Sequence, residues 1–406
     1  MTPAYFEEKH FQRALKRHIK SQPHRFILKV PPFFKDQAIS ELNFRNIAKE
    51  GSIEATEAGI EFDTTIEGLY AAHALLHTPS RILMEINRFR AGAVEELFKK
   101  AVSLPWELYI NPRLPVRIHS RIRNSRINHE GAAAETLFSA VSLHFDAPPF
   151  REQVTQAGSR DESGDPSQIQ RIYLNVEHNQ CRIAADTSGE HLHKRGFRQY
   201  ASGAPIRETL AAGFLFWILD RIEAPGCVLD PMCGSGTFPM EWAQCSSAGS
   251  LYSAETSRAF TFEHLPWHRP NTWNFINNQP YEPMLPPVPL FASDIDAGTV
   301  ELARKNFASA GISDRIHLDC RNFFDLNAAA YPAGTPGLIV ANLPYGIRRP
   351  EGSGDFFKKF VRHAKDAFPG WTVACIGPEN VTRHNSRDHI SFFNGGIRVN
   401  GVILDI

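Results

Sequence analysis

Short apolar runs separated by turn residues fill most of the chain, and the spacing of apolar positions within the runs changes along it. Alternating apolar positions predict strands, and apolar positions three or four residues apart predict amphipathic helices. The first part predicts strands at 24–30, 59–62, 81–89, 114–120, 171–176 and 181–185, and helices at 35–42, 66–76, 93–102 and 131–145. Strands and helices are mixed there without strict alternation, which is typical of an α+β region.

From about residue 202 the pattern becomes a regular alternation of helix and strand. Helices are predicted at 205–219, from 238, at 298–310 and at 355–367, and strands at 227–229, 290–292, 316–318, 337–341, 372–376 and 397–406. Such alternation predicts a mostly parallel, doubly wound sheet. The polar segment 156–168 is predicted to be a flexible loop. Residues 1–20 are predicted to form an exposed amphipathic helix.

The composition narrows the class of protein. The 406 residues carry 44 basic and 44 acidic side chains, so a protein held to nucleic acid by bulk charge is excluded, although a local basic face is not. The longest apolar stretch, 211–219, is far shorter than the roughly 20 residues of a membrane span. The N-terminus has no apolar signal region, and the six cysteines form no CxxC pair. We therefore expect a reducing cytoplasm, no disulfide framework and no metal site.

A glycine-rich turn, Leu229–Thr237 (LDPMCGSGT), carries the strongest local signal, between a predicted strand and a predicted helix. Glycines let the backbone approach a ligand, and a helix N-terminus favours polar ligand groups. Asp230 can accept a hydrogen bond from an amine. Pro239 stands where the dinucleotide fingerprint has its third glycine, and no phosphate-binding GK[ST] follows. An ordinary strand-to-helix turn is the alternative interpretation.

Two further polar sites follow predicted strands. A carboxylate at Asp294 can accept from both ribose hydroxyls, while Asp296 is placed to cap the helix near Gly298. In Asn342-Leu-Pro-Tyr-Gly346, the Asn342 side chain and the next carbonyl can both accept from one exocyclic amino group. Tyr345 can stack on a flat base. A simple turn is the alternative, but open α/β sheets bind ligands at the carboxyl ends of their strands.

In this order, residues 230–237, 294–296 and 342–346 resemble motifs I, II and IV of class I S-adenosylmethionine-dependent methyltransferases. The Asn-Leu-Pro-Tyr form resembles enzymes that methylate amino groups. Further stretches are similar to the THUMP-containing RNA methyltransferase family, whose bacterial members make N2-methylguanine in large-subunit ribosomal RNA: 59–63, 80–83, 105–107, 125–129, 186–198, 204–212 and 266–268. The resemblance covers roughly residues 24–406.

The resemblance implies the domain organisation. It comprises an N-terminal helical extension at 1–23, a ferredoxin-like region at 24–110, a THUMP core at 111–188, a linker at 189–203 and a class I methyltransferase domain at 204–406. The last domain would be a Rossmann-like sheet of seven strands with its final strand antiparallel. The extension matches nothing in the family.

The resemblance also implies site residues, with S-adenosylmethionine as the cofactor. The methionine part would be lined by Asp230, Cys233, Gly234, Gly236 and Thr237, the ribose by Asp294 with Asp296 beside it, and the adenine by Asn322 or, alternatively, Asp319. The target base would be held by Asn342, Leu343, Pro344 and Tyr345. Because methyl transfer depends chiefly on positioning, no strong base and no metal is expected. The base must leave its stack to enter such a pocket.

Five arginines without an acidic partner lie between residues 113 and 126, and a second basic group lies near residue 195. The predicted RNA contacts are Arg113, Arg117, Arg121, Arg123, Arg126, Lys194, Arg195 and Arg198. A solvated strand edge is the alternative interpretation. The leading hypothesis is an RNA guanine-N2 methyltransferase acting on 23S ribosomal RNA. The alternatives are a tRNA guanine-N2 methyltransferase, an N6-adenine nucleic-acid methyltransferase, and a non-catalytic RNA-binding assembly factor.

Overall fold

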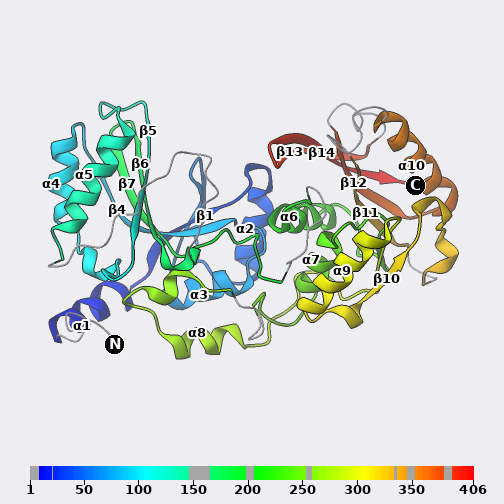
Figure 1. The fold of residues 1–406 in the computed structure, drawn as a ribbon, viewed down its shortest axis with the longest axis horizontal. Coiled ribbons are helices and arrows are strands. Elements are labelled where there is room, and N and C mark those ends of the chain that lie inside the picture. Colours follow the sequence, from blue (N-terminus) through cyan, green and yellow to red (C-terminus); the bar gives the residue numbers. More distant parts are fainter. Residues whose placement is uncertain are drawn as a thin grey trace.

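The chain builds two sheets that lie beside each other (Figure 1). The computed structural model describes residues 9–20, 22–145, 165–197, 205–252, 258–332, 336–344, 353–378 and 386–406. Most of the predicted flexible segment 156–168 lies outside these residues, as do Arg198, Tyr345 and Gly346.

Seven strands form the N-terminal sheet, in the order β2-β3-β1-β4-β7-β6-β5. They are β1 (His24–Lys29), β2 (Glu54–Thr56), β3 (Gly59–Thr64), β4 (Arg81–Arg90), β5 (Val116–Arg123), β6 (Gln170–Glu177) and β7 (Gln180–Asp186). Neighbours are antiparallel except β5 and β6, which are parallel. Because β4 pairs with β7, regions 24–110 and 111–188 share one continuous sheet, so the boundary expected near residue 110 does not separate two sheets.

Helices cover one face of this sheet. They are α2 (Lys35–Phe44), α3 (Ile66–Leu75), α4 (Val94–Val102) and α5 (Glu130–Ser142). Strand alternation explains the two faces. In β1, Phe26 and Leu28 join the large helix-covered core, whereas Ile27 points to the other face and joins a small cluster with Leu83 and Ala184. That second face carries most of the charged strand residues.

The C-terminal sheet has the order β10-β9-β8-β11-β12-β14-β13. Its strands are β8 (Val228–Asp230), β9 (Leu290–Asp294), β10 (Ile316–Cys320), β11 (Leu338–Asn342), β12 (Thr372–Pro378), β13 (Asp388–Asn394) and β14 (Ile397–Asp405). Strands β8 to β12 run parallel, and β14 runs antiparallel to both of its neighbours. The predicted sheet of seven strands with an antiparallel final strand is therefore confirmed.

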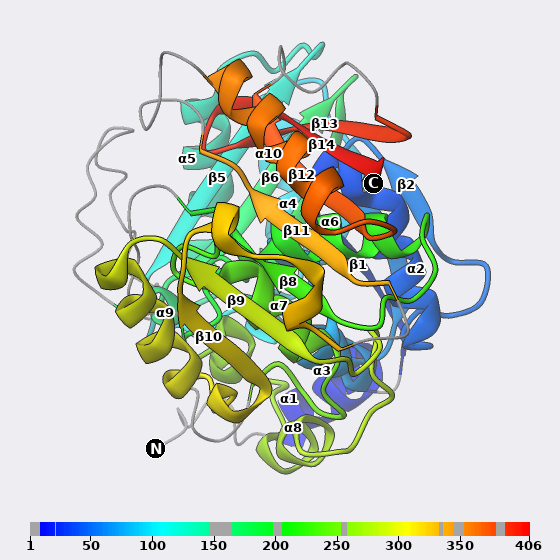
Figure 2. The same cartoon turned by 90° about the vertical axis from the view of Figure 1, so that its right-hand side faces the viewer.

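Helices cover both faces of this second sheet, so its strands are apolar on both sides. One face packs against α6 (Glu208–Leu219), α7 (Thr237–Cys245) and α9 (Ala297–Ser309), and the other against α10 (Ser353–Ala367). Figure 2 shows α10 on one side of the strands, with α6 and α7 on the other.

The two regions interlock more than the expected boundary at residue 204 implies. The segment between α7 and β9, which includes α8 (Pro270–Asn277), buries Phe260, Trp267 and Trp273 in the core of the N-terminal region. In the opposite direction, Phe34 packs in the core of the C-terminal sheet. The chain order therefore does not divide the molecule into independent cores.

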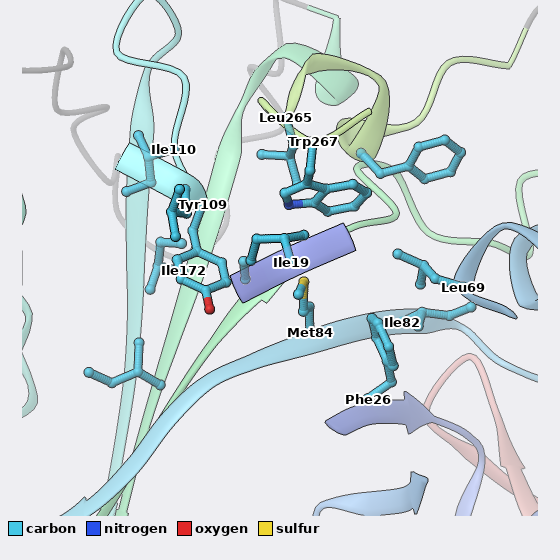
Figure 3. Close-up of a cluster of buried hydrophobic side chains, with 14 of the residues drawn as sticks. Ile19, Phe26, Leu69, Ile82, Met84, Tyr109, Ile110, Ile172, Leu265 and Trp267 are labelled. Atoms are coloured by element: carbon cyan, nitrogen blue, oxygen red, sulfur yellow. The ribbon is translucent and has the colours of Figure 1, made fainter. Parts of the chain in front are cut away.

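The N-terminal extension differs from its prediction. It forms α1 (Lys9–Leu15) and a π-helical turn (Lys16–Lys20), whose apolar side chains are buried rather than exposed. Ile19 lies among Met84, Tyr109 and Trp267 (Figure 3). Within residues 9–20, the exposed side chains are all polar.

All six cysteines are free thiols, which agrees with the absence of a disulfide pattern in the sequence. Within the described part of the chain, no helix combines the length and apolar character needed to cross a bilayer.

Candidate active site

Three of the predicted site residues occupy the last position of neighbouring parallel strands. Asp230 ends β8, Asp294 ends β9 and Asn342 ends β11. Strand β8 lies between the other two, so their carboxyl ends meet at one edge of the sheet. The three sequence motifs, which are spread over more than a hundred residues from Asp230 to Asn342, are thereby brought together.

Backbone hydrogen bonds fix the glycine-rich turn after β8. The Cys233 amide donates to the Ser293 carbonyl at 3.0 Å, and the Gly236 amide donates to the Cys233 carbonyl at 2.8 Å. Gly234 and Gly236 adopt positive φ angles of 55° and 88°, a conformation that glycine enters without steric cost. At Gly236 a Cβ would lie 2.4 Å from the Phe307 ring, whereas at Gly234 the Cβ position is open space. The turn is therefore tightly packed at Gly236 and open at Gly234.

Asp294 joins this turn to the next strand. Its Oδ2 accepts from the Gly234 amide at 3.0 Å, and its Oδ1 accepts from the Asp296 amide at 3.1 Å. Asp296 is exposed and caps α9 by accepting from the Thr299 amide at 2.6 Å. The capping role predicted for Asp296 is thus confirmed, and its predicted contact with a cofactor stays a prediction.

Asp230 is almost fully buried, and its Oδ1 accepts from the Met232 amide at 3.2 Å. Burial, and secondarily the charge of Asp294, raises the pKa of Asp230 well above its ordinary value. A cationic ligand group beside Asp230 would favour its ionised form.

A cavity of about 610 Å³ opens at this edge of the sheet. It is lined by Pro231, Met232, Gly234, Asp294, Ile295, Thr299, Asn322, Phe323, Phe324, Asn342, Pro344, Phe356 and Lys359. Asn322 lines it and the exposed Asp319 does not, which favours Asn322 as the polar group beside a bound ligand. A small hollow of about 40 Å³ adjoins it through Met232, Gly234 and Asn342, and is lined also by Asp230, Cys233 and Thr237.

The sequence did not single out several residues that line this cavity. Ile295 and Thr299 flank the Asp294 turn, Phe324 follows Asn322, and Phe356 and Lys359 come from α10. Phe324 and Phe356 could have been suspected only from their position after a strand or in a helix that borders the site. They supply flat apolar walls, and Lys359 supplies a cation.

Asn342 carries a buried polar atom that has no partner among the described residues, because its Oδ1 accepts no hydrogen bond from them. The next residue, Leu343, is buried and donates its amide to the Ile376 carbonyl at 3.0 Å, which fixes the turn after β11. Pro344 follows in the cavity wall. The roles predicted for Tyr345 lie outside the described residues.

A second hollow, of about 700 Å³, lies on the N-terminal sheet. We call it the basic groove, because its walls hold more cations than acids: Lys29, Arg88, Arg121, Arg123 and Arg182 against Glu57 and Glu177. Arg88 and Arg182 are already paired with Glu61 and Glu85. Burial, and then repulsion by Arg182 and Arg121, lowers the pKa of Lys29 to about 8. The groove therefore brings two of the eight predicted RNA contacts, Arg121 and Arg123, together with three cations that were not predicted.

Other predicted RNA contacts have different surroundings. Arg113 and Arg126 are exposed, Arg117 is half-buried, and none of the three lines the groove. Lys194 is exposed and pairs with Glu190.

The prediction for Arg195 is wrong. Its side chain is completely buried, and its Nη2 lies 3.3 Å from Glu241 Oε2, so it is not accessible to RNA. Glu241 also faces His77 Nδ1 at 3.4 Å, and His77 lies 3.2 Å from Cys245 Sγ. These three groups lie close enough to hold a metal ion, but the Arg195 guanidinium already occupies both carboxylate oxygens. The network joins α7 to the N-terminal region.

Comparison with known families matches residues 195–388 to the RMKL-like methyltransferase domain. Ribosomal RNA large subunit methyltransferase K/L of Methylococcus capsulatus is 29% identical over 341 residues, which are 80% of this chain and 43% of that protein. The protein of the same name in Syntrophotalea carbinolica is 29% identical over 88% of this chain and 50% of its own length. The chain thus spans about half the length of these curated relatives.

Solved structures share the fold of the whole chain. A predicted N6-adenine-specific DNA methylase from Listeria monocytogenes superposes with a TM-score of 0.76 at 20% identity, covering 99% of both chains. TrmN from Thermus thermophilus gives a TM-score of 0.67 at 18% identity, covering 94% of this chain and 99% of its own. At these identities the comparison shows a common architecture.

Proposed function

We propose, from the match of residues 195–388 to the RMKL-like methyltransferase domain, that the chain transfers a methyl group from S-adenosylmethionine to RNA. The finer proposal is methylation of the exocyclic N2 of a guanosine in 23S ribosomal RNA. The named relatives are large-subunit ribosomal RNA methyltransferases, and this chain matches about half of each.

The observation that carries the proposal is the buried, unpartnered Oδ1 of Asn342 at the cavity wall. A buried acceptor without a partner costs about 1–3 kcal/mol. A ligand that brings a hydrogen-bond donor to this position removes that cost. An exocyclic amino group has two hydrogens, and Asn342 Oδ1 and the Leu343 carbonyl are two acceptors in sequence.

The residues present suit the proposed cofactor. Asp294 is fixed at the cavity edge by the Gly234 amide, and it keeps acceptor capacity for the hydroxyls of a ribose. Asp230 and Thr237 line the small hollow beside it, where an amino-acid moiety would bind. The open space at Gly234 allows a ligand to approach the backbone closely. When bound, S-adenosylmethionine supplies an electrophilic methyl group.

Asn342 and Leu343 would act by orientation and charge. The amino lone pair of guanine is delocalised into the ring, so its nitrogen is a weak nucleophile. Acceptors placed on the two amino hydrogens orient the nitrogen and stabilise the positive charge that develops on it. Phe324 and Phe356 offer aromatic surfaces to a flat group in the cavity. The amino proton is released to solvent after transfer.

The basic groove supports RNA as the substrate class. Lys29 lies in it half-buried, where Arg182 and Arg121 repel its charge more than Glu61 attracts it, and phosphate groups would add counter-charge. Arg121 and Arg123 are therefore the best supported of the predicted RNA contacts. The cytoplasmic location and the independence from metal remain predictions.

The experiment is methyl transfer from radiolabelled S-adenosylmethionine to undermodified 23S ribosomal RNA and to undermodified tRNA. Nuclease digestion and chromatography then identify the labelled nucleoside. We expect label in N2-methylguanosine from ribosomal RNA. Label only in tRNA would move the substrate to that class, label in N6-methyladenosine would refute the guanine assignment, and no label in either RNA would refute the proposed activity.

A further inference from the structure

The N-terminal helix, residues 9–20, has two sharply different faces. Phe11, Leu15 and Ile19 lie four residues apart and are 7%, 1% and 0% exposed. This stripe packs into the core of the N-terminal region (Figure 3), where Ile19 contacts side chains from several elements. The helix is thus part of the folded core and not a loose tail.

Side-chain contacts also hold the end of the helix. The His24 ring bonds to the Ile19 carbonyl at 2.8 Å, and Gln22 Nε2 donates to the Arg17 carbonyl at 2.9 Å. A basic amphipathic helix commonly binds a membrane surface through its apolar face. Here that face is already buried in protein, so the helix has only its cationic face to offer a partner.

That outer face is strongly basic. We call it the N-terminal basic face and define it by Lys9, Arg13, Lys16, Arg17 and Lys20. The first four are exposed and Lys20 is half-buried. Residues 9–20 contain no acidic residue, and Glu7 and Glu8 are the only two in residues 1–22. Within the described residues, none of the five cations has an ion-pair partner.

The arrangement contrasts with other basic positions in the chain. On α4, Lys99 and Lys100 follow Glu95 and Glu96 at helical spacing, so the charges balance locally. On the N-terminal helix, like charges repeat at spacings of three and four residues, which destabilises an isolated helix. Burial, and then repulsion from Arg269, lowers the pKa of Lys20. A polyanion would relieve this repulsion.

We propose that the N-terminal basic face binds the phosphate backbone of the RNA substrate. The inference rests on the proposed RNA methylation and extends it to a segment outside the methyltransferase domain. A helix rises about 1.5 Å per residue, so Lys9 to Lys20 span roughly 16 Å, which is long enough to contact several phosphates. The contacts would be independent of sequence, because phosphates carry no base information.

The test compares two double variants with the full-length protein. Lys16→Gln/Arg17→Gln removes two charges from the basic face and leaves the apolar stripe intact. Lys49→Gln/Lys99→Gln removes two exposed charges that have acidic residues nearby: Glu50 follows Lys49, and Glu95 and Glu96 lie four and three residues before Lys99. Binding of a fluorescent fragment of 23S ribosomal RNA is measured by anisotropy between about 50 and 200 mM KCl, and thermal melting checks the fold.

We expect the Lys16/Arg17 variant to bind about tenfold more weakly at low salt, with a log–log salt slope reduced by about 1 to 2. Its turnover at saturating RNA should equal that of the wild type. The Lys49/Lys99 control should keep the wild-type affinity and slope. Equal affinity and slope for all three proteins would overturn the inference. Polyglutamate that competes with the labelled RNA as strongly as unlabelled RNA does would also overturn it.

Failure of the inference and failure of the proposed function are distinguishable. If the wild type methylates RNA but the Lys16/Arg17 variant binds RNA unchanged, only the role of the helix is refuted. If the wild type transfers no methyl group to any RNA, the proposed function fails, while the binding measurement still reports on the basic face.

Discussion

Asp294 Oδ2 accepts a hydrogen bond from the Gly234 amide at 3.0 Å, which ties the end of β9 to the glycine-rich turn after β8. One carboxylate thereby fixes the backbone conformation of the neighbouring motif and stays at the edge of the cavity. We expect Asp294→Ala to weaken binding of S-adenosylhomocysteine about 100-fold, which is about 2.7 kcal/mol.

Isothermal calorimetry measures this change. Asp294→Asn keeps one side-chain oxygen acceptor and should give an intermediate affinity. Asp314→Ala, which changes an exposed aspartate in the turn before β10, serves as the control and should bind as the wild type does. Wild-type affinity in Asp294→Ala would show that this carboxylate does not contact the cofactor.

Alanine substitutions at the two motif glycines, Gly234 and Gly236, should have different effects on stability and on cofactor affinity. At Gly236 a Cβ meets the Phe307 ring at 2.4 Å, so Gly236→Ala should lower the melting temperature. At Gly234 the space is open, so Gly234→Ala costs only the strain of its φ of 55°, about 1–2 kcal/mol, but places a methyl group in the ligand's path. We expect Gly234→Ala to lose more affinity for S-adenosylhomocysteine than stability. If the affinity loss merely followed the melting temperature in both variants, the open space would have no role in binding.

Cofactor affinity should depend on pH through Asp230. Burial raises the pKa of its carboxyl well above the usual range, and the nearby charge of Asp294 adds to the effect. The protonated form thus predominates to higher pH than usual, whereas a cationic amino group of the cofactor favours the carboxylate. Binding should therefore release a proton and strengthen as pH rises through the raised pKa.

Calorimetry in buffers of different ionisation enthalpy counts this proton. Asp230→Asn has no proton to release, so its affinity should be weaker and free of this pH dependence. An identical pH profile in the wild type and in Asp230→Asn would assign the titration to another group.

The buried pair of Arg195 and Glu241 should stabilise the joined regions. Burial alone would raise the pKa of Glu241, but Arg195, followed by His77, outweighs burial, and the pKa is lowered. Glu241→Ala leaves the Arg195 guanidinium buried without its counter-ion, which should cost about 3–5 kcal/mol in urea unfolding. The exposed pair of Lys194 and Glu190 is the control, and Glu190→Ala should cost less than about 1 kcal/mol.

The sign of the pH dependence follows from the lowered pKa. A carboxylate with a depressed folded pKa stabilises the fold above its ordinary pKa, near 4, and loses that contribution as pH falls through the folded value. The difference between the wild type and Glu241→Ala should therefore shrink in acid. A difference that stays constant down to pH 3 would mean that the ion pair is not its source.

Local signals in the sequence predicted the strands and the site residues at their ends. Asp296 illustrates why, because an aspartate three residues before a free helical amide caps the helix whatever its tertiary surroundings. Asp230, Asp294 and Asn342 come together because parallel strands align their carboxyl ends, which the alternating pattern already implies.

Residues whose role depends on neighbours that are distant in the chain could not be identified from the sequence. Arg195 follows Lys194 and looks like part of a basic surface, but its partner Glu241 lies 46 residues later and is completely buried. The basic groove needs the strand order, because Lys29, Arg88 and Arg182 come from three strands that become neighbours only in the folded sheet. The buried stripe at Leu15 and Ile19 likewise depends on a surface built by other segments.

Nucleoside-resolved mass spectrometry of 23S ribosomal RNA tests the central claim most directly. The RNA is taken from a strain that lacks this protein and from the same strain complemented with the wild type or with Asn342→Ala. We predict that one N2-methylguanosine disappears in the deletion strain, returns with the wild type and does not return with Asn342→Ala, although that variant still binds S-adenosylhomocysteine in vitro. Full restoration of the modification by Asn342→Ala, or an unchanged ribosomal RNA in the deletion strain, would contradict the account.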